Sequence, residues 1–350
     1  MIRIGWRLPP TALATAAPRD PLDRAVRVGL LSLTALLLLT LPPRQNPEVF
    51  YLMSAGIAYG IAVLSLVVLV GLVGQFSLAQ AGFMGVGAFA AAHLVTDAHV
   101  PFLLAVPLGG LAAVPVGMLA AIPALRVRGV LLAVVTLSFG QALDTLFFQA
   151  KTNGGGLGGV ALARPDVLAS DVHYYWFELA VLGGLCAFVC MFRTRKTGRV
   201  LAAVRESEPA ALAVGINLVR AKVAAFGLSA FIAGVAGVVY AGINQSAAAG
   251  DYTAFKSIGL LAVAVIGGLG SAAGAVIGGL LNTLAPYYIA RLPLVGSGDL
   301  TGVVFGAGLV LQMVVAPQGI ASQVLEAERM LALQLRVRWQ NQNRPLEAIG

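Results

Sequence analysis

Apolar blocks of about 20 residues follow one another through most of this chain, separated by short polar or Gly/Pro-rich segments. A block of that length is what an α-helix needs to cross the hydrocarbon core of a membrane. The blocks are continuous and do not alternate apolar with polar residues, which disfavours a transmembrane β-barrel. Charged residues make up only 11% of the chain, against about 25% in soluble globular proteins. We therefore predict an all-α polytopic membrane protein.

The blocks predict about ten membrane spans, with helix breaks in some of them. One block, Leu260–Leu269, is too short to cross unaided and is expected to be half of a broken helix. The first block follows positive charge, as in a signal peptide, but Pro42-Pro43-Arg44 stands where a cleavage site would lie, so an uncleaved helix is expected. The predicted organisation is a basic tail (1–27), a transmembrane domain (28–320) and a polar tail (321–350). The predicted spans are 25–41, 50–73, 80–96, 101–124, 129–149, 175–192, 222–242, 257–270, 273–292 and 300–316.

One stretch between apolar blocks, Arg193–Lys222, carries nine charged residues, of which seven are Lys or Arg. A charged side chain costs about 2.5–3.5 kcal/mol at the centre of a membrane helix, so this 193–222 segment is expected in water. If the amino terminus lies inside, the inner segments hold 18 Lys and Arg and the outer segments hold 5. Because basic residues are enriched in cytoplasmic loops, we predict that both termini and the 193–222 segment are cytoplasmic.

The glycine-rich stretch Gly71–Phe89 is the most unusual part of the membrane domain, because Gln75, Ser77 and Gln80 lie within it. Glycine weakens a helix by about 1 kcal/mol relative to alanine, so a helix break is expected. Such breaks occur at membrane depth where they line protein or a water-filled cavity. A second stretch, Gly267–Gly279, repeats part of the pattern, and paired interruptions are typical of transporter sites. The alternative for both stretches is close helix packing through small residues.

No catalytic or metal-binding constellation is found in the sequence, so neither an enzyme nor a cofactor of its own is predicted. There is no HExxH or GxSxG motif and no Cys/His cluster. Asp144 is the only acid that we expect to reach a span, and we place it at a wet interface near the outer end. Cys186 and Cys190 are interpreted as small apolar residues that stay reduced; a disulfide or metal pair is the alternative.

The sequence resembles the permease subunits of branched-chain amino acid ABC importers, the LivM type more than the LivH type. The motifs that carry this resemblance occur in the family's order and cover roughly residues 50–320. They are Gly71-Leu-Val-Gly-Gln-Phe-Ser-Leu-Ala-Gln-Ala-Gly-Phe-Met-Gly-Val-Gly-Ala88, Thr136-Leu-Ser-Phe-Gly140, Thr152-Asn-Gly-Gly-Gly-Leu157, Ala203-Val-Arg-Glu-Ser-Glu-Pro-Ala-Ala-Leu-Ala-Val-Gly-Ile-Asn217, Ile266-Gly-Gly-Leu-Gly-Ser271 and Ala316-Pro-Gln-Gly-Ile320.

The resemblance implies that Glu208, Ala210, Ala211 and Gly215 form the loop that docks the permease onto its ATPase. The residue types suit a short helix over 210–214, because proline is favoured in a first turn, acidic residues at the amino end and glycine after the last turn. A merely solvated loop that obeys the positive-inside rule is the alternative. The chain departs from the family at Gly259, where a glutamate often stands.

The resulting hypothesis is an ABC importer permease in the bacterial inner membrane, moving branched-chain amino acids or a similar small polar solute such as urea or an amide. The implied partners are a second, LivH-like permease, two cytoplasmic ATPase subunits that bind the ATP, and an external solute-binding protein; no nucleic-acid partner is expected. Gln75, Ser77 and Gln80 are the expected substrate path. The alternative is a self-sufficient secondary transporter or channel, which the scarcity of ionisable residues within the spans disfavours.

Overall fold

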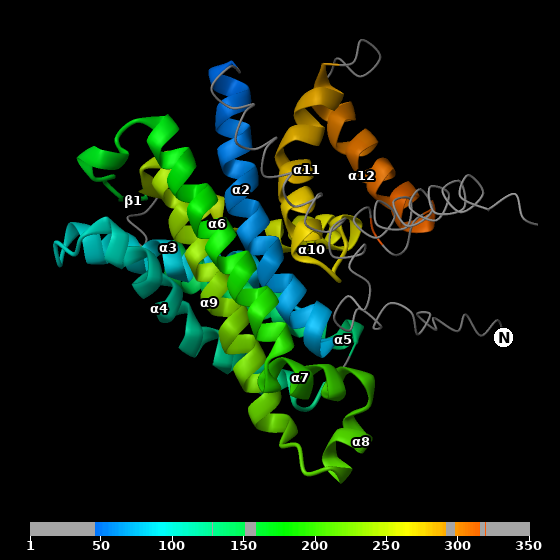
Figure 1. Ribbon diagram of the computed structural model, residues 1–350. Helices are drawn as coiled ribbons and strands as arrows, with labels where there is room; N and C mark the ends of the chain where they lie inside the picture. Colours follow the sequence, from blue (N-terminus) through cyan, green and yellow to red (C-terminus); the bar gives the residue numbers. More distant parts are fainter. Residues whose placement is uncertain (1–45, 128, 151–158, 292–297, 316–318, 320–350) are drawn as a thin grey trace, which may run out of the picture.

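The computed structural model describes residues 46–127, 129–150, 159–291, 298–315 and 319. The predicted first span (25–41) and both predicted tails (1–27 and 321–350) lie outside these residues. Gly319, near the end of the predicted transmembrane domain, is described. The described chain is a bundle of α-helices with one two-stranded sheet (Figure 1), as the sequence predicts. The helices and strands are α2 (Pro47–Val68), the π-helix η3 (Leu69–Val73), α3 (Gln80–Thr96), α4 (Phe102–Ala124), α5 (Val130–Leu143), the π-helix η4 (Asp144–Phe148), β1 (Val160–Ala161), the 3-10 helix η6 (Asp166–Leu168), α6 (Asp171–Thr194), α7 (Lys196–Glu206), α8 (Glu208–Ala213), α9 (Leu218–Asn244), β2 (Ser246–Ala247), the 3-10 helix η7 (Ala249–Asp251), α10 (Lys256–Gly267), α11 (Ala272–Ala290) and α12 (Gly298–Val315).

Helices α2, α3 and α9 form the centre of the bundle, and their residues are buried along most of their lengths. Small residues let these helices approach closely. A Cβ on Gly234 of α9 would lie 3.0 Å from the Cα of Gly110 of α4, and one on Gly60 of α2 would lie 3.5 Å from a carbonyl oxygen of α11. Lipid supplies no hydrophobic force between helices, so such close backbone contact is what holds the bundle together.

Seven helical segments in the described ranges are long and apolar enough to cross a membrane. Three of the ten predicted spans are not among these seven: the first is not described, and the other two correspond to α3 and α12. Helix α3 has 17 residues, which is shorter than the helix of about 20 residues that an average bilayer requires. The crossing segments are Pro47–Val73, Phe102–Ala124, Val130–Phe148, Asp171–Thr194, Leu218–Asn244, Ala249–Gly267 and Ala272–Ala290.

Helices α7 and α8 lie together at one end of the bundle, at the bottom of Figure 1, which we call the loop end. The 193–222 segment is therefore mostly helical, although the sequence predicts only one short helix within it. Glu48 marks the opposite end, where it accepts hydrogen bonds at 3.1 Å from Tyr287 and from Arg291 of the α11 terminus. At the same end, the Tyr51 hydroxyl donates to Asn244 at the close of α9.

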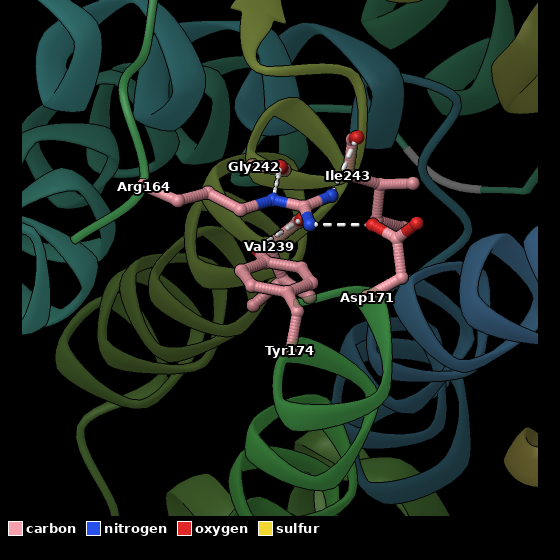
Figure 2. A network of polar contacts seen from close by, with 6 residues as sticks. All are labelled: Arg164, Asp171, Tyr174, Val239, Gly242 and Ile243. Carbon is pink, nitrogen blue, oxygen red and sulfur yellow. Dashed lines mark hydrogen bonds and ion pairs between the residues drawn. The ribbon is translucent and has the colours of Figure 1, made fainter. Parts of the chain in front are cut away.

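Arg164 organises the opposite end (Figure 2). Its guanidinium donates to the carbonyl oxygens of Gly242 (2.5 Å) and Ile243 (2.7 Å), which lie in the last turn of α9. It also pairs with Asp171 at 2.8 Å and lies 4.1 Å from the ring centroid of Tyr174. A cation is well placed here, because the carboxyl end of a helix carries partial negative charge.

Candidate functional site

The candidate site begins at a helix break over residues 74–79, which the sequence predicts. Gly74 ends the π-helix with φ of +73°, a conformation that favours glycine, and its N–H donates to the Val70 carbonyl at 3.1 Å. The chain then runs without helix until α3 begins at Gln80. A similar interruption separates α10 from α11, where Gly268 has φ of +108°. The paired breaks predicted from the two glycine-rich stretches are thus present.

Distant side chains satisfy the backbone N–H groups at the start of α3. Leu78 donates to the Thr136 hydroxyl of α5 at 2.9 Å, and Ala81 donates to the Ser257 hydroxyl of α10 at 3.0 Å. Ala79 donates to Ser77 at 3.3 Å. Unsatisfied backbone groups at membrane depth cost several kcal/mol each, so these hydroxyls allow the break to exist inside the bundle.

Gln80 lies at the centre of a buried polar network that joins three helices. Its side-chain oxygen accepts from Ser65 of α2 at 3.1 Å, and its amide donates to Ser229 of α9 at 3.3 Å. Ser229 in turn donates to the Ser65 carbonyl at 2.9 Å. All three side chains are fully buried, so this network fixes how α2, α3 and α9 pack together.

Gln75 and Ser77 lie in the break itself, and both are buried. The backbone N–H of Gln75 donates to the Leu69 carbonyl at 3.3 Å, which continues the turn around Gly74. Between them, Phe76 is 40% exposed. The break therefore contains two buried polar side chains and one partly exposed aromatic ring, close in sequence to Gln80.

The predicted docking helix is present as α8, which begins two residues earlier than expected. The Ser207 hydroxyl accepts from the Ala210 N–H at 3.3 Å and caps the helix. Pro209 occupies its first turn, as predicted, and Gly215 follows its last turn with φ of +82°. Ala211 faces inward and is 2% exposed.

A buried ion pair anchors α8 to the start of α9. The Lys222 ammonium lies 2.9 Å from the Glu208 carboxylate, and the two side chains are only 3% and 13% exposed. Lys222 also donates to the Ala124 carbonyl of α4 at 3.4 Å. The sequence predicts that the 193–222 segment lies in water, and this is wrong for Lys222, whose side chain is buried. The burial is possible because the partner charge, Glu208, comes from the same segment.

A cavity of about 430 Å³ lies beside this ion pair. Several apolar side chains around α8 are exposed, among them Leu212 (57%) and Val214 (75%). The loop end thus presents a short capped helix, a neighbouring hollow and an apolar surface. The cavity is lined by Leu125, Glu208, Leu212, Asn217, Leu218, Val219 and Lys222.

Two acidic residues differ from the expectations drawn from the sequence. Asp144 is 3% exposed, so a wet interface is wrong for it; its carboxylate accepts from Gln149 at 3.2 Å. Glu178 lies within a predicted span and is fully buried on α6, so Asp144 is not the only acid to reach a span. Neither carboxylate oxygen of Glu178 makes a hydrogen bond within the described part of the chain. The sequence could have predicted a buried acid here, because Glu178 lies inside the predicted span 175–192.

No group of three or more His, Cys, Asp or Glu within the described ranges is placed to hold a metal ion. Cys186 and Cys190 are both free thiols, one half-buried and one exposed. The loop end combines a short capped helix with exposed apolar side chains, and the polar groups of the break are held within a helical bundle.

Comparisons of the sequence with known proteins give a family model and two relatives. The family model described as "Branched-chain amino acid transport system / permease component" matches residues 49–313. Two relatives are each called "High-affinity branched-chain amino acid transport system permease protein LivM", one from Salmonella typhimurium (strain LT2) and one from Escherichia coli (strain K12). Each is 28% identical over 290 residues, covering 75% of this chain and 67% of the relative. No solved structure gives a significant match. Because the family model matches well over half of its residues, this chain belongs to the permease component family of branched-chain amino acid transport systems.

Proposed function

We propose that this chain is the LivM-type transmembrane permease subunit of an ABC importer that moves branched-chain amino acids or a similar small polar solute. The supporting observation is α8, a capped helix with exposed apolar neighbours, anchored through the buried pair of Glu208 and Lys222. A helix that enters a groove on a soluble partner needs such a rigid base, because fixing it beforehand lowers the entropy cost of binding.

The proposed partners are a LivH-like second permease, two cytoplasmic ATPase subunits and an external solute-binding protein. In this proposal the loop end faces the cytoplasm of a bacterial cell with the chain in the inner membrane and both termini inside. The asymmetry of Lys and Arg along the sequence supports that orientation. The ATP is bound by the partner subunits.

The proposed docking set is Glu208, Ala210, Ala211 and Gly215. Glu208 holds α8 through its ion pair, Ala210 and Ala211 form the helix, and Gly215 supplies the left-handed turn that ends it. Leu212 belongs with this set, because its side chain is more than half exposed and lines the neighbouring cavity.

The proposed substrate path includes the break and the start of α3, with Gln75, Ser77 and Gln80. The support for it is that polar groups gather at a helix interruption inside the bundle. Because Gln80 already has two side-chain partners, a role in transport requires that its network opens during the cycle.

A copurification experiment tests the docking proposal. In Leu212→Glu, a charge replaces an exposed apolar side chain of α8, and we expect about tenfold less ATPase subunit to copurify with the permease. Thr197→Glu is the matched control, because Thr197 is also exposed at the loop end but lies on α7. Equal recovery of the ATPase subunit with wild type and Leu212→Glu would refute the docking site.

The alternative, a self-sufficient secondary transporter, gains one supporting observation from the structure, the buried carboxyl group of Glu178. Ionisable residues inside a membrane are functional candidates by default. The purified chain, reconstituted alone, distinguishes the two proposals. Uptake of leucine without ATPase subunits would favour the alternative, whereas uptake that requires them supports the importer.

A further inference from the structure

Two arginines of the 193–222 segment reach from the loop end to the two helix breaks. Arg205, near the end of α7, donates Nη1–H to the carbonyl oxygen of Gly71, in the last turn before the first break. Arg193, in the last turn of α6, donates Nη1–H to the carbonyl oxygen of Gly270, within the second break, at 2.6 Å. Each break is thus bonded to the segment that carries α8.

The Gly71 carbonyl lies in the last turn of η3, and this explains why arginine suits its side of the contact, whereas Gly270 lies between α10 and α11. The last carbonyls of a helix have no partner in the helix and carry partial negative charge. A guanidinium beside them supplies both a donor and a positive charge, and hydrogen bonds to charged groups are roughly twice as strong as neutral ones. Such a bond can transmit displacement in a way that a loose apolar contact does not.

The surroundings of Arg205 hold its side chain against the first break. A Cβ on Gly74 would lie 3.2 Å from the Cγ of Arg205, so the arginine packs directly on the residue that ends the π-helix. Leu201 and Val204, on the same helix, are buried and anchor α7 to the bundle. Burial lowers the pKa of the Arg205 guanidinium, and the neighbouring Glu206 opposes this. The group still stays charged at neutral pH, because arginine is not deprotonated in proteins.

Only Glu206 separates Arg205 from Ser207, which caps α8. Helix α8 therefore cannot move far without moving Arg205 or breaking its bond to Gly71. The Gly71 carbonyl, in turn, lies in the turn that leads through Gly74 to Gln75 and the break. A continuous path of covalent links and contacts thus runs from α8 through Arg205 and Gly71 to the first break.

We propose that Arg205 is a positioning residue that carries movement of α8 to the first helix break, and that Arg193 does the same for the second break. This inference rests on the proposed function, because it assumes that α8 receives its movement from an ATPase. It adds that the 193–222 segment itself holds the two breaks. A movement of α8 would therefore change the conformation of the proposed path.

Arg205→Gln tests the inference in the assembled transporter, reconstituted with its partner subunits and binding protein. We expect the complex to assemble and hydrolyse ATP, while leucine uptake per ATP hydrolysed falls about tenfold. Arg205→Lys keeps the charge and one donor in reach, so it should recover a large part of the coupling. The matched control is Arg199→Gln, on the same helix, because Arg199 donates to the Thr194 carbonyl at 2.7 Å and, among the described residues, makes no hydrogen bond to either break.

A labelling readout separates positioning from a merely structural role. In a background with Cys186 and Cys190 replaced by alanine, a Gln75→Cys thiol should change its rate of labelling by a soluble maleimide when ATP is added. Arg205→Gln should abolish that change and Arg199→Gln should leave it intact. An unchanged uptake-to-ATP ratio, or an ATP-dependent labelling change that survives Arg205→Gln, would overturn the inference. A wild-type chain that fails to bind the ATPase would overturn the proposed function instead.

Discussion

Removing one member of the buried pair formed by Glu208 and Lys222 should loosen α8 while the rest of the bundle stays folded. The two charges lie 2.9 Å apart and the lysine side chain is 3% exposed. Breaking a buried ion pair by removing one partner typically costs about 3–5 kcal/mol, because the other charge stays buried without compensation. Here the cost can be relieved locally if α8 detaches and water reaches the pair.

The two single substitutions should differ in size. Glu208→Gln leaves the ammonium of Lys222 buried beside the Ala124 carbonyl, 3.4 Å away, so we expect a cost of about 3 kcal/mol. Lys222→Met leaves the carboxylate at the amino end of α8 with its side chain 13% exposed, where water and the helix dipole offset part of the loss, so about 1–2 kcal/mol is expected. The double substitution should be close to neutral, because it removes both charges.

Amide hydrogen exchange in lipid nanodiscs measures this directly. The reporters are the N–H groups of Val214 and Ile216, which donate to Ala210 and Ala211 at 3.3 and 3.0 Å. A loss of about 2 kcal/mol in local stability raises their exchange rates about 30-fold. Exchange within α9 should change much less, because its central residues are buried in the bundle.

The double-substitution cycle decides whether the reasoning holds. Strong coupling, in which the double variant exchanges more slowly than Glu208→Gln alone, is the expected result. Additive effects of the two substitutions would refute the view that the pair anchors α8. Asp251→Asn is the matched control, because Asp251 pairs with Lys256 at 3.6 Å in a more exposed setting, where an ion pair contributes about 1 kcal/mol or less.

Three further predictions concern other parts of the molecule. Gly215→Ala should lower the free energy of unfolding by about 1 kcal/mol and weaken coupling to the ATPase, because Gly215 has φ of +82°. Gly259→Ala is the control and should do neither, because a Cβ at this helical position meets free space. Thermal unfolding and uptake measure the two effects. Gln80→Leu should lower leucine uptake without loss of assembly, and a drop in thermal stability alone would make Gln80 a packing residue. Arg164→Met should lower the free energy of unfolding by about 2–4 kcal/mol, because two carbonyls and Asp171 lose a charged donor; denaturation in mild detergent measures it.

The features that sequence could predict are those that depend on neighbouring residues. The apolar blocks predict the membrane helices because burial in lipid depends mainly on length and composition. The turn at Gly74 and the helix α8 follow from glycine, proline and serine acting within a few residues of one another. The docking role of α8 and the path role of Gln75 stay predictions, because they concern partners and a substrate.

Helix α7 was missed because the charges of the 193–222 segment were interpreted only as a sign of exposure to water. Its sequence did carry a helical signal, since Leu201 and Val204 are three residues apart and both are buried. Charge and burial are compatible on one short helix, because its opposite faces meet different surroundings. Arg205 combines the two, with a charged end that binds the Gly71 carbonyl and an aliphatic stem packed on Gly74.

The contacts that satisfy the first break could not be found from sequence, for a physical reason. The Thr136 hydroxyl accepts a hydrogen bond from the N–H of Leu78, 58 residues away in the sequence. The Ser257 hydroxyl accepts one from the N–H of Ala81, 176 residues away. A lone Thr or Ser in an apolar block usually bonds its own helix, and Thr136 does this too, with the Leu132 carbonyl at 3.0 Å. Its second role appears only when the break of another helix is placed against it. A break at membrane depth therefore requires hydroxyl groups somewhere in the chain, and only the packing of α5 and α10 against α3 determines which ones serve.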